Sequence, residues 1–181
     1  MIIRSVDISD ERILADAYKV ECAANAKARP KWIGRGVEAR ILGWRAEDGW
    51  AKHLLESWDS AELQGFVASR ASEGEPGTGT TWIFPWAHPR YEGKGVGAGL
   101  MRAAEDDWPS TTTRFIASAY RPALEAIAAL VERFLTPLGY TVATTETVVD
   151  LDLESFGSAA RPAGRAIQHS HPHQRCARSS P

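Results

Sequence analysis

Residues 88–100, from His88 to Leu100, read HPRYEGKGVGAGL, with glycine at 93, 95, 97 and 99. The preceding run, Thr80 to Ala87, is rich in the β-branched and aromatic residues that strands favour, and an amphipathic run to Trp108 follows. Glycine tolerates a positive φ, so it lets backbone N–H groups approach a ligand, and the start of a helix adds unpaired donors and partial positive charge. The stretch therefore predicts a strand, a glycine-rich turn and a helix whose N-terminus binds phosphate.

Two nucleotide-binding motifs with glycine-rich turns do not fit this spacing. A dinucleotide fingerprint G-x-G-x-x-G that starts at Gly93 ends on Ala98 instead of glycine. One that starts at Gly95 ends on Leu100. A P-loop requires Ser or Thr after Gly-Lys, whereas Gly95 follows Lys94. A simpler interpretation also stays open, in which the glycines serve only a tightly packed strand-to-helix connection.

The spacing Arg90-x-x-Gly93-x-Gly95 instead resembles the R/Q-x-x-G-x-G/A signature of the GNAT superfamily of acetyl-CoA-dependent N-acetyltransferases. A later segment, residues 138–140 (LGY), is similar to the L-G-F/Y that ends a helix in that superfamily. The motif-bearing resemblance covers residues 80–153, and the order of predicted elements extends it to the N-terminus. The style of the sequence also resembles the first half of tandem GNAT proteins of high-GC bacteria.

The resemblance implies an α/β (α+β) GNAT fold, in which helices flank a central mixed, mostly antiparallel sheet with two splayed parallel strands. It implies acetyl-CoA as the cosubstrate, with the pyrophosphate on the glycine-rich turn and the thioester oxygen near a backbone N–H of the preceding strand, at about Trp86 or Ala87. We expect Arg90 to contact a phosphate or hold the loop, and Glu92 to point away from an anionic ligand. The expected cofactor-binding residues are Trp86, Ala87, Arg90, Glu92, Gly93, Lys94, Gly95, Val96, Gly97 and Ala98.

Two residues are candidates for proton transfer. An alkyl ammonium has a pKa near ~10 and a thiol near ~8.5, so deprotonating the amine matters more than protonating the leaving thiolate. Glu56 is the candidate base, because carboxylates on the acceptor side often take this role in the superfamily; an ordinary strand carboxylate is the alternative. The tyrosine that the superfamily usually places four residues before the glycine of L-G-F/Y is replaced by Leu135. Tyr120 is the substitute candidate acid, and a half-buried core tyrosine is the alternative.

Two functions follow from this resemblance. The first is an N-acetyltransferase that transfers the acetyl group of acetyl-CoA to a primary amine by direct attack in a ternary complex. The second is a catalytically weak acyl-CoA-binding or scaffolding GNAT module, which the missing tyrosine and the likeness to half of a tandem protein favour. The acceptor is expected to be a small-molecule or peptide amine.

Hydrophobic periodicity predicts the other elements. Before the glycine-rich stretch we expect a strand over residues 2–6, a helix from Ser9 or Asp10 to about Ala26, a weaker helical region over 31–49, and a hairpin of strands 52–58 and 63–71. After it we expect a strand over residues 112–119, a helix over 122–135 and a closing hairpin of strands 141–144 and 147–153. Pro85 removes a hydrogen-bond donor from the strand over residues 80–87, which predicts a bulge there.

Composition predicts one folded domain and a tail. The chain has 181 residues, 44% of them hydrophobic, which is sufficient for a single core. Residues 1–156, the predicted acetyltransferase domain, contain all 23 acidic residues. Residues 157–181 contain four arginines and three histidines but no acid and no apolar periodicity. They predict a disordered basic tail, at the place where the second half of a tandem protein would begin.

The same features limit partners and location. The acidic body has no basic patch for nucleic acid, and no run approaches the ~18 apolar residues of a membrane span. The N-terminus lacks the features of a signal peptide, so we expect a cytoplasmic protein. Cys22 and Cys176 are expected to be reduced thiols, and no spacing predicts a metal site. A homodimer is compatible with all of these features.

Overall fold

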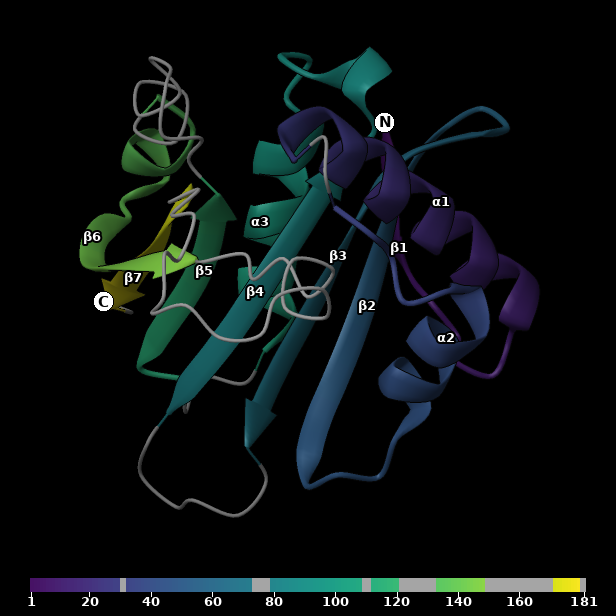
Figure 1. Ribbon diagram of the computed structural model, residues 1–181, viewed down its shortest axis with the longest axis horizontal. Coiled ribbons are helices and arrows are strands. Elements are labelled where there is room, and N and C mark those ends of the chain that lie inside the picture. Colours follow the sequence, from purple (N-terminus) through teal and green to yellow (C-terminus); the bar gives the residue numbers. More distant parts are fainter. Residues whose placement is uncertain (30–31, 73–78, 109–111, 121–132, 149–170, 180–181) are drawn as a thin grey trace, which may run out of the picture.

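A seven-stranded mixed sheet in the order β1-β2-β3-β4-β5-β7-β6 forms the centre of the protein (Figure 1). The computed structural model describes residues 1–29, 32–72, 79–108, 112–120, 133–148 and 171–179. The strands are β1 (Ile2–Ser5), β2 (Trp50–Asp59), β3 (Glu62–Ser72), β4 (Thr80–Ala87), β5 (Arg114–Tyr120), β6 (Thr141–Val148) and β7 (His171–Ser179). The helices are α1 (Glu11–Ala28), α2 (Val37–Arg45), α3 (Val96–Asp107) and the 3-10 turns η1 (Pro89–Tyr91) and η2 (Thr136–Leu138).

The described helices form layers on both faces of the sheet. Helices α1 and α2 cover one face, and α3 lies behind the other (Figure 1). Neighbouring strand residues face opposite layers, as the two-residue period of a strand requires. In β2, Leu54 packs under α1 and α2, whereas Leu55 packs against the α3 side. In β3, Phe66 packs on the α1/α2 side and Val67 on the α3 side, so the sheet has a hydrophobic core on each face.

The N-terminal helices largely follow the sequence-based expectations. The Asp10 carboxylate caps α1 by accepting hydrogen bonds from the backbone N–H groups of Arg12 and Ile13. The weaker helical region is confirmed but is shorter than expected, because α2 spans only nine residues. Its N-cap is Gly36, which provides no side-chain cap. The predicted hairpin of β2 and β3 is also confirmed. None of the described helices is long and apolar enough to span a membrane.

The parallel strands β4 and β5 pair over only part of their length. Residues Thr80–Ile83 pair with Arg114–Ala117, and the strands then diverge toward the upper end of the view in Figure 1. The pairing of β4 with β3 continues without a register shift from Thr81 to Ala87, so the predicted bulge at Pro85 is wrong. The discontinuity lies on the β5 side instead, which confirms the expected pair of splayed parallel strands.

The missing N–H of Pro85 explains why the pairing of β4 with β5 ends at Ile83. Backbone groups of successive strand residues point to opposite neighbours. The N–H of His88 donates to the Gln64 carbonyl at 2.9 Å, in register with the β3–β4 ladder, so even-numbered positions of β4 face β3. Odd-numbered positions therefore face β5, and the first of these after Ile83 is Pro85, which has no N–H to donate.

The C-terminal part of the chain departs from the sequence-based expectations. Residues 171–179 form β7, which pairs with β5 on one side and β6 on the other, so the expected disorder of the tail does not hold for this segment. The predicted closing hairpin is also wrong, because residues 141–148 form the single strand β6, and this strand pairs with β7. The strand lacks apolar alternation, but the backbone groups of two neighbouring strands fix it in place. Residues 157–170, and most of the expected helix over 122–135, lie outside the described residues.

Truncation after Gly157 is expected to destabilise the protein, because it removes a strand that is paired along both edges. We expect the thermal midpoint to fall by about 5 °C or more, given the number of ladder hydrogen bonds lost. Removal of residues 180–181 alone retains β7 and is the matched control. Equal midpoints for the two truncated proteins would contradict the position of β7.

Candidate functional site

The glycine-rich turn joins the diverging end of β4 to α3. The short helix η1 follows His88, whose side chain caps it by accepting a hydrogen bond from the Arg90 N–H. Gly93 and Gly95 then adopt positive φ angles of 75° and 82°, in the region that favours glycine. Gly95 is the N-cap of α3, and no side chain caps the helix. The first amides of α3 are therefore donors without an intrahelical acceptor.

The four glycines serve two different purposes. A Cβ atom added at Gly93 or Gly95 would meet nothing within 4 Å, so open space lies beside the backbone at both positions. A Cβ atom at Gly97 would approach the Phe134 ring to 3.1 Å. One at Gly99 would approach the Met1 Cε atom to 2.7 Å. The first two glycines form the turn, and the second two allow α3 to pack closely.

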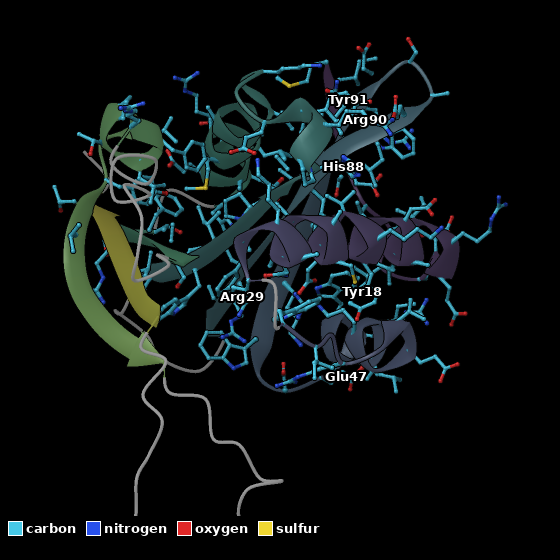
Figure 2. The ribbon with its side chains drawn as sticks, turned by 45° about the horizontal axis from the view of Figure 1, so that its top comes forward. Tyr18, Arg29, Glu47, His88, Arg90 and Tyr91 are labelled. Carbon is cyan, nitrogen blue, oxygen red and sulfur yellow. The ribbon has the colours of Figure 1, made fainter. Side chains whose placement is uncertain are left out.

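The charged residues of the turn are held by neighbours. The Arg90 guanidinium donates to the Glu62 carboxylate at 2.9 Å, and Figure 2 shows Arg90 beside Tyr91 and near His88. Hydrogen bonding to Tyr91 and the charge of Arg90 lower the pKa of Glu62. Arg90 thus holds the loop against the start of β3, which is one of its two expected roles.

Two cations lie next to the open turn. The Glu92 carboxylate forms an ion pair with Lys27 in the last turn of α1. The Lys94 ammonium lies 5.0 Å from the centroid of the buried Tyr91 ring. Sequence reasoning missed Lys27, because its contact with Glu92 spans 65 residues. An anion on the α3 amides would have both lysines in its vicinity.

The end of β4 directs one backbone donor into the opening between the strands. Trp86 and Ala87 both lie beyond the last residue that pairs with β5. Because the N–H groups of successive β4 residues point to opposite sides, the Trp86 N–H faces β3, whereas the Ala87 N–H faces the opening. Ala87 is therefore the better placed of the two residues expected to bind the thioester oxygen.

Aromatic side chains line the α1/α2 face of the sheet beside this opening. Trp82, Phe84 and Trp86 project from alternate positions of β4, with successive ring centroids 6.5 and 6.2 Å apart. All three are half-buried. Phe66 of β3 stacks on Trp86 at 4.8 Å, which connects the row to the core below α2. The row is a flat apolar surface next to the place where β4 leaves β5.

A partly buried ion pair borders this surface on its helical side. The Arg40 guanidinium donates to the Glu21 carboxylate at 2.7 Å, and its carbon lies 5.7 Å from the Trp86 ring centroid. Burial raises the pKa of Glu21, although Arg40 and Arg29 act in the opposite direction. Figure 2 shows Arg29 at the end of α1. Sequence reasoning missed this cluster, although Glu21 follows the buried Leu14 and Ala17 at helical spacing, which is a signal that could have revealed it.

The fold agrees with that of solved acetyltransferases. Over 98% of this chain and 92% of the other, it matches yncA from Salmonella typhimurium, solved with its cofactor acetyl-CoA, at 18% identity and a TM-score of 0.63. It matches the ribosomal-protein-alanine N-acetyltransferase from Brucella melitensis over 99% and 100% of the two chains, at 16% identity and a TM-score of 0.61. An aminoglycoside 6'-N-acetyltransferase complexed with coenzyme A matches over 99% and 97%, at 12% identity and a TM-score of 0.61.

The chain has the GNAT fold. This confirms the predicted fold class, including the mixed sheet and the splayed strands. No model of a known protein family matches the sequence. No curated protein sequence matches it either.

The two candidate catalytic residues lie at different places in this GNAT fold. Tyr120 is the last residue of β5, on the strand that borders the opening. Glu56 lies on β2, with β3 between it and β4, and its side chain is fully enclosed below α1. Its Oε2 atom accepts a hydrogen bond from the Trp58 indole at 2.8 Å and lies 3.7 Å from Arg4. The assignment of Glu56 as the base therefore gains no support from its position.

A cleft of about 620 Å³ lies elsewhere in the fold, between the end of α2 and the start of β2. Its lining includes Trp44, Asp48, Trp50 and Lys52. Trp50 pairs with Ser72, at the opposite end of the sheet from Ala87. The glycine-rich turn and this cleft are thus separate features.

Glu56→Gln is expected to make stability less sensitive to pH. Burial raises the pKa of Glu56, against the opposing effects of Trp58 and Arg4. A raised folded-state pKa favours folding while the carboxyl is protonated, and this contribution is lost as pH rises through that pKa. The variant should therefore gain stability relative to the parent protein as pH rises from below ~4.3, measured by urea unfolding from pH 4 to pH 8.

Glu38→Gln, at an exposed position of α2, is the matched control and should show no such gain. A stability difference between Glu56→Gln and the parent that stays constant over this range would show that folding does not raise the pKa of Glu56.

Proposed function

We propose that the protein is an N-acetyltransferase that transfers the acetyl group of acetyl-CoA to a primary amine. The observation that carries the proposal is the combination of an uncapped, open glycine turn with an adjacent opening between two parallel strands. A phosphate-bearing cosubstrate with a long narrow arm fits this combination, with its phosphates on the turn and its arm between the strands. The fold is shared with structures solved with acetyl-CoA or coenzyme A.

The cosubstrate would lie on the residues that border this opening. The amides of Gly93 to Ala98 would bind the pyrophosphate, with Lys27 and Lys94 adding positive charge. Arg90 would act through Glu62, by fixing the position of the loop. The Ala87 N–H would donate to the thioester oxygen and stabilise the oxyanion that forms in the transition state.

The acceptor amine would attack the thioester carbonyl carbon directly, in a ternary complex. Its lone pair forms the C–N bond, the tetrahedral intermediate collapses, and the C–S bond breaks to release the thiolate. The nitrogen loses one proton to a base, and the thiolate gains one from an acid or from water. Tyr120 is the proposed acid and Glu56 the proposed base, and both assignments stay predictions.

One observation favours the alternative of a catalytically weak acyl-CoA-binding module. Leu135 occupies the position of the usual GNAT tyrosine, and its side chain is buried in the core against the α3 layer. A leucine there cannot protonate the thiolate. Both functions predict acetyl-CoA binding, but only the enzyme releases free thiol when an amine is added.

Gly95→Asp is expected to abolish acetyl-CoA binding while the protein stays folded. It puts a side chain and a negative charge into the open space beside the turn, where the phosphates are proposed to lie. We expect the affinity measured by calorimetry to fall by about 100-fold or more. Gly36→Asp is the matched control, because Gly36 is also a helix N-cap with positive φ, open space and no side-chain cap. Equal affinities for the two variants would remove the turn as the cofactor site.

The rate of acetyl transfer is expected to climb with pH. An ammonium with a pKa near 10 leaves only ~0.1% free amine at pH 7, whereas a thiolate leaves readily near neutral pH. Tyr120→Phe should then lower kcat/KM by less than ~10-fold. The base assignment requires Glu56→Gln to lower kcat/KM by about 100-fold or more. A falling alkaline limb together with a larger loss in Tyr120→Phe would show that an acid limits the reaction instead.

A further inference from the structure

We propose that Arg70 binds a carboxylate of the acetyl acceptor, and that the acceptor is an amine carrying both a carboxylate and a flat apolar side chain. This inference rests on the proposed acetyltransferase function and names its substrate class. It follows from the surroundings of Arg70, from its position relative to the opening between β4 and β5, and from the aromatic row on β4.

Arg70 contacts aromatic rings, and it takes part in none of the ion pairs found among the described residues. Its guanidinium carbon lies 4.7 Å from the Trp50 ring centroid and 5.5 Å from that of Phe84. The residue is exposed. Within the part of the chain that the structure describes, no carboxylate lies within ion-pair distance of it. By contrast, ion pairs hold the arginines at 4, 40, 45 and 90.

Such a guanidinium is prepared for a planar anion. Ring contacts hold the group in place and leave its N–H edge available, so less side-chain entropy is lost when a ligand binds. The planar fork matches a carboxylate in a bidentate arrangement, and such charge-assisted hydrogen bonds are about twice as strong as neutral ones. A carboxylate is therefore the ligand group that Arg70 fits best.

The position of Arg70 places that carboxylate close to the point where β4 and β5 part. Arg70 pairs with Trp82, and Trp82 pairs with Ile116 of β5, one row before the strands part. Phe84, over which the guanidinium lies, is the first residue of β4 beyond the last paired position, Ile83. A short amino acid bound to Arg70 would thus present its amine at the point where the opening between the strands begins.

The rest of the ligand would lie on the aromatic row. The half-buried Trp82, Phe84 and Trp86 offer a flat apolar surface on the same face as Arg70. The Arg40 guanidinium borders the row on its helical side. It donates a hydrogen bond to the Glu21 carboxylate, so the negative charge of Glu21 is already paired. This arrangement favours an anionic aromatic amine over a polycation.

The test compares matched amines on the full chain with acetyl-CoA present. Phenylalanine and tryptophan carry the carboxylate, and phenethylamine and tryptamine lack it. We expect the parent protein to prefer the first pair. Arg70→Gln should raise KM for that pair by about 10- to 100-fold with little change in kcat, and should leave the second pair unaffected. Arg102→Gln, an exposed position on α3 across the sheet, is the matched control and should change neither.

A binding measurement separates this inference from the proposed function. 3-Phenylpropanoate, which has the ring and the carboxylate but no amine, should bind the coenzyme A complex in calorimetry and lose that binding in Arg70→Gln. Normal acetyl-CoA affinity with no binding of 3-phenylpropanoate, or with equal use of the two amine pairs, overturns the role of Arg70 and leaves the acetyltransferase proposal intact. Loss of acetyl-CoA binding by the parent protein overturns the proposed function itself.

Discussion

The separation of β4 from β5 is the constraint on which the proposed site depends. Pro85 occupies the first β5-facing position after the last paired residue, Ile83, and it cannot donate a hydrogen bond. The sheet stays intact on the other side, where β3 and β4 pair through to Ala87. One strand can therefore pair with β3 along one edge and direct a backbone donor into the opening along the other. The glycine turn and the uncapped start of α3 lie just beyond that free edge.

The opening also explains how two faces of the fold contribute to one reaction. The turn and α3 provide amides and nearby lysines for an anion, whereas the α1/α2 face provides the aromatic row and the arginines. Strand β4 lies between the two regions and connects them, because it leads into the glycine turn and carries the aromatic row. A cosubstrate arm between the strands would thus meet an acceptor lying on the aromatic row without any rearrangement of the sheet.

Local patterns predicted the elements around the site, because each depends on nearby residues. The ends of β4, the glycine turn, a helix cap at Ser9 or Asp10 and the β2–β3 hairpin all followed from composition and spacing. Two contacts between distant segments could not be predicted. The strand β7 has no apolar alternation and exists through the strands on either side, while the ion pair of Lys27 with Glu92 joins distant segments. Glu56 was misleading for the same reason, since only the position of α1 shows that it is enclosed.

The most direct test of the account is to map acetyl-CoA onto the backbone by amide NMR. Titration is expected to shift the amide resonances of Ala87 and of residues 93–98, together with those of Lys27, at one common affinity. No comparable change is expected around the cleft at Trp44 to Lys52. Shifts confined to that cleft, with the glycine turn unaffected, would contradict the central claim that the opening beside the turn binds the cosubstrate.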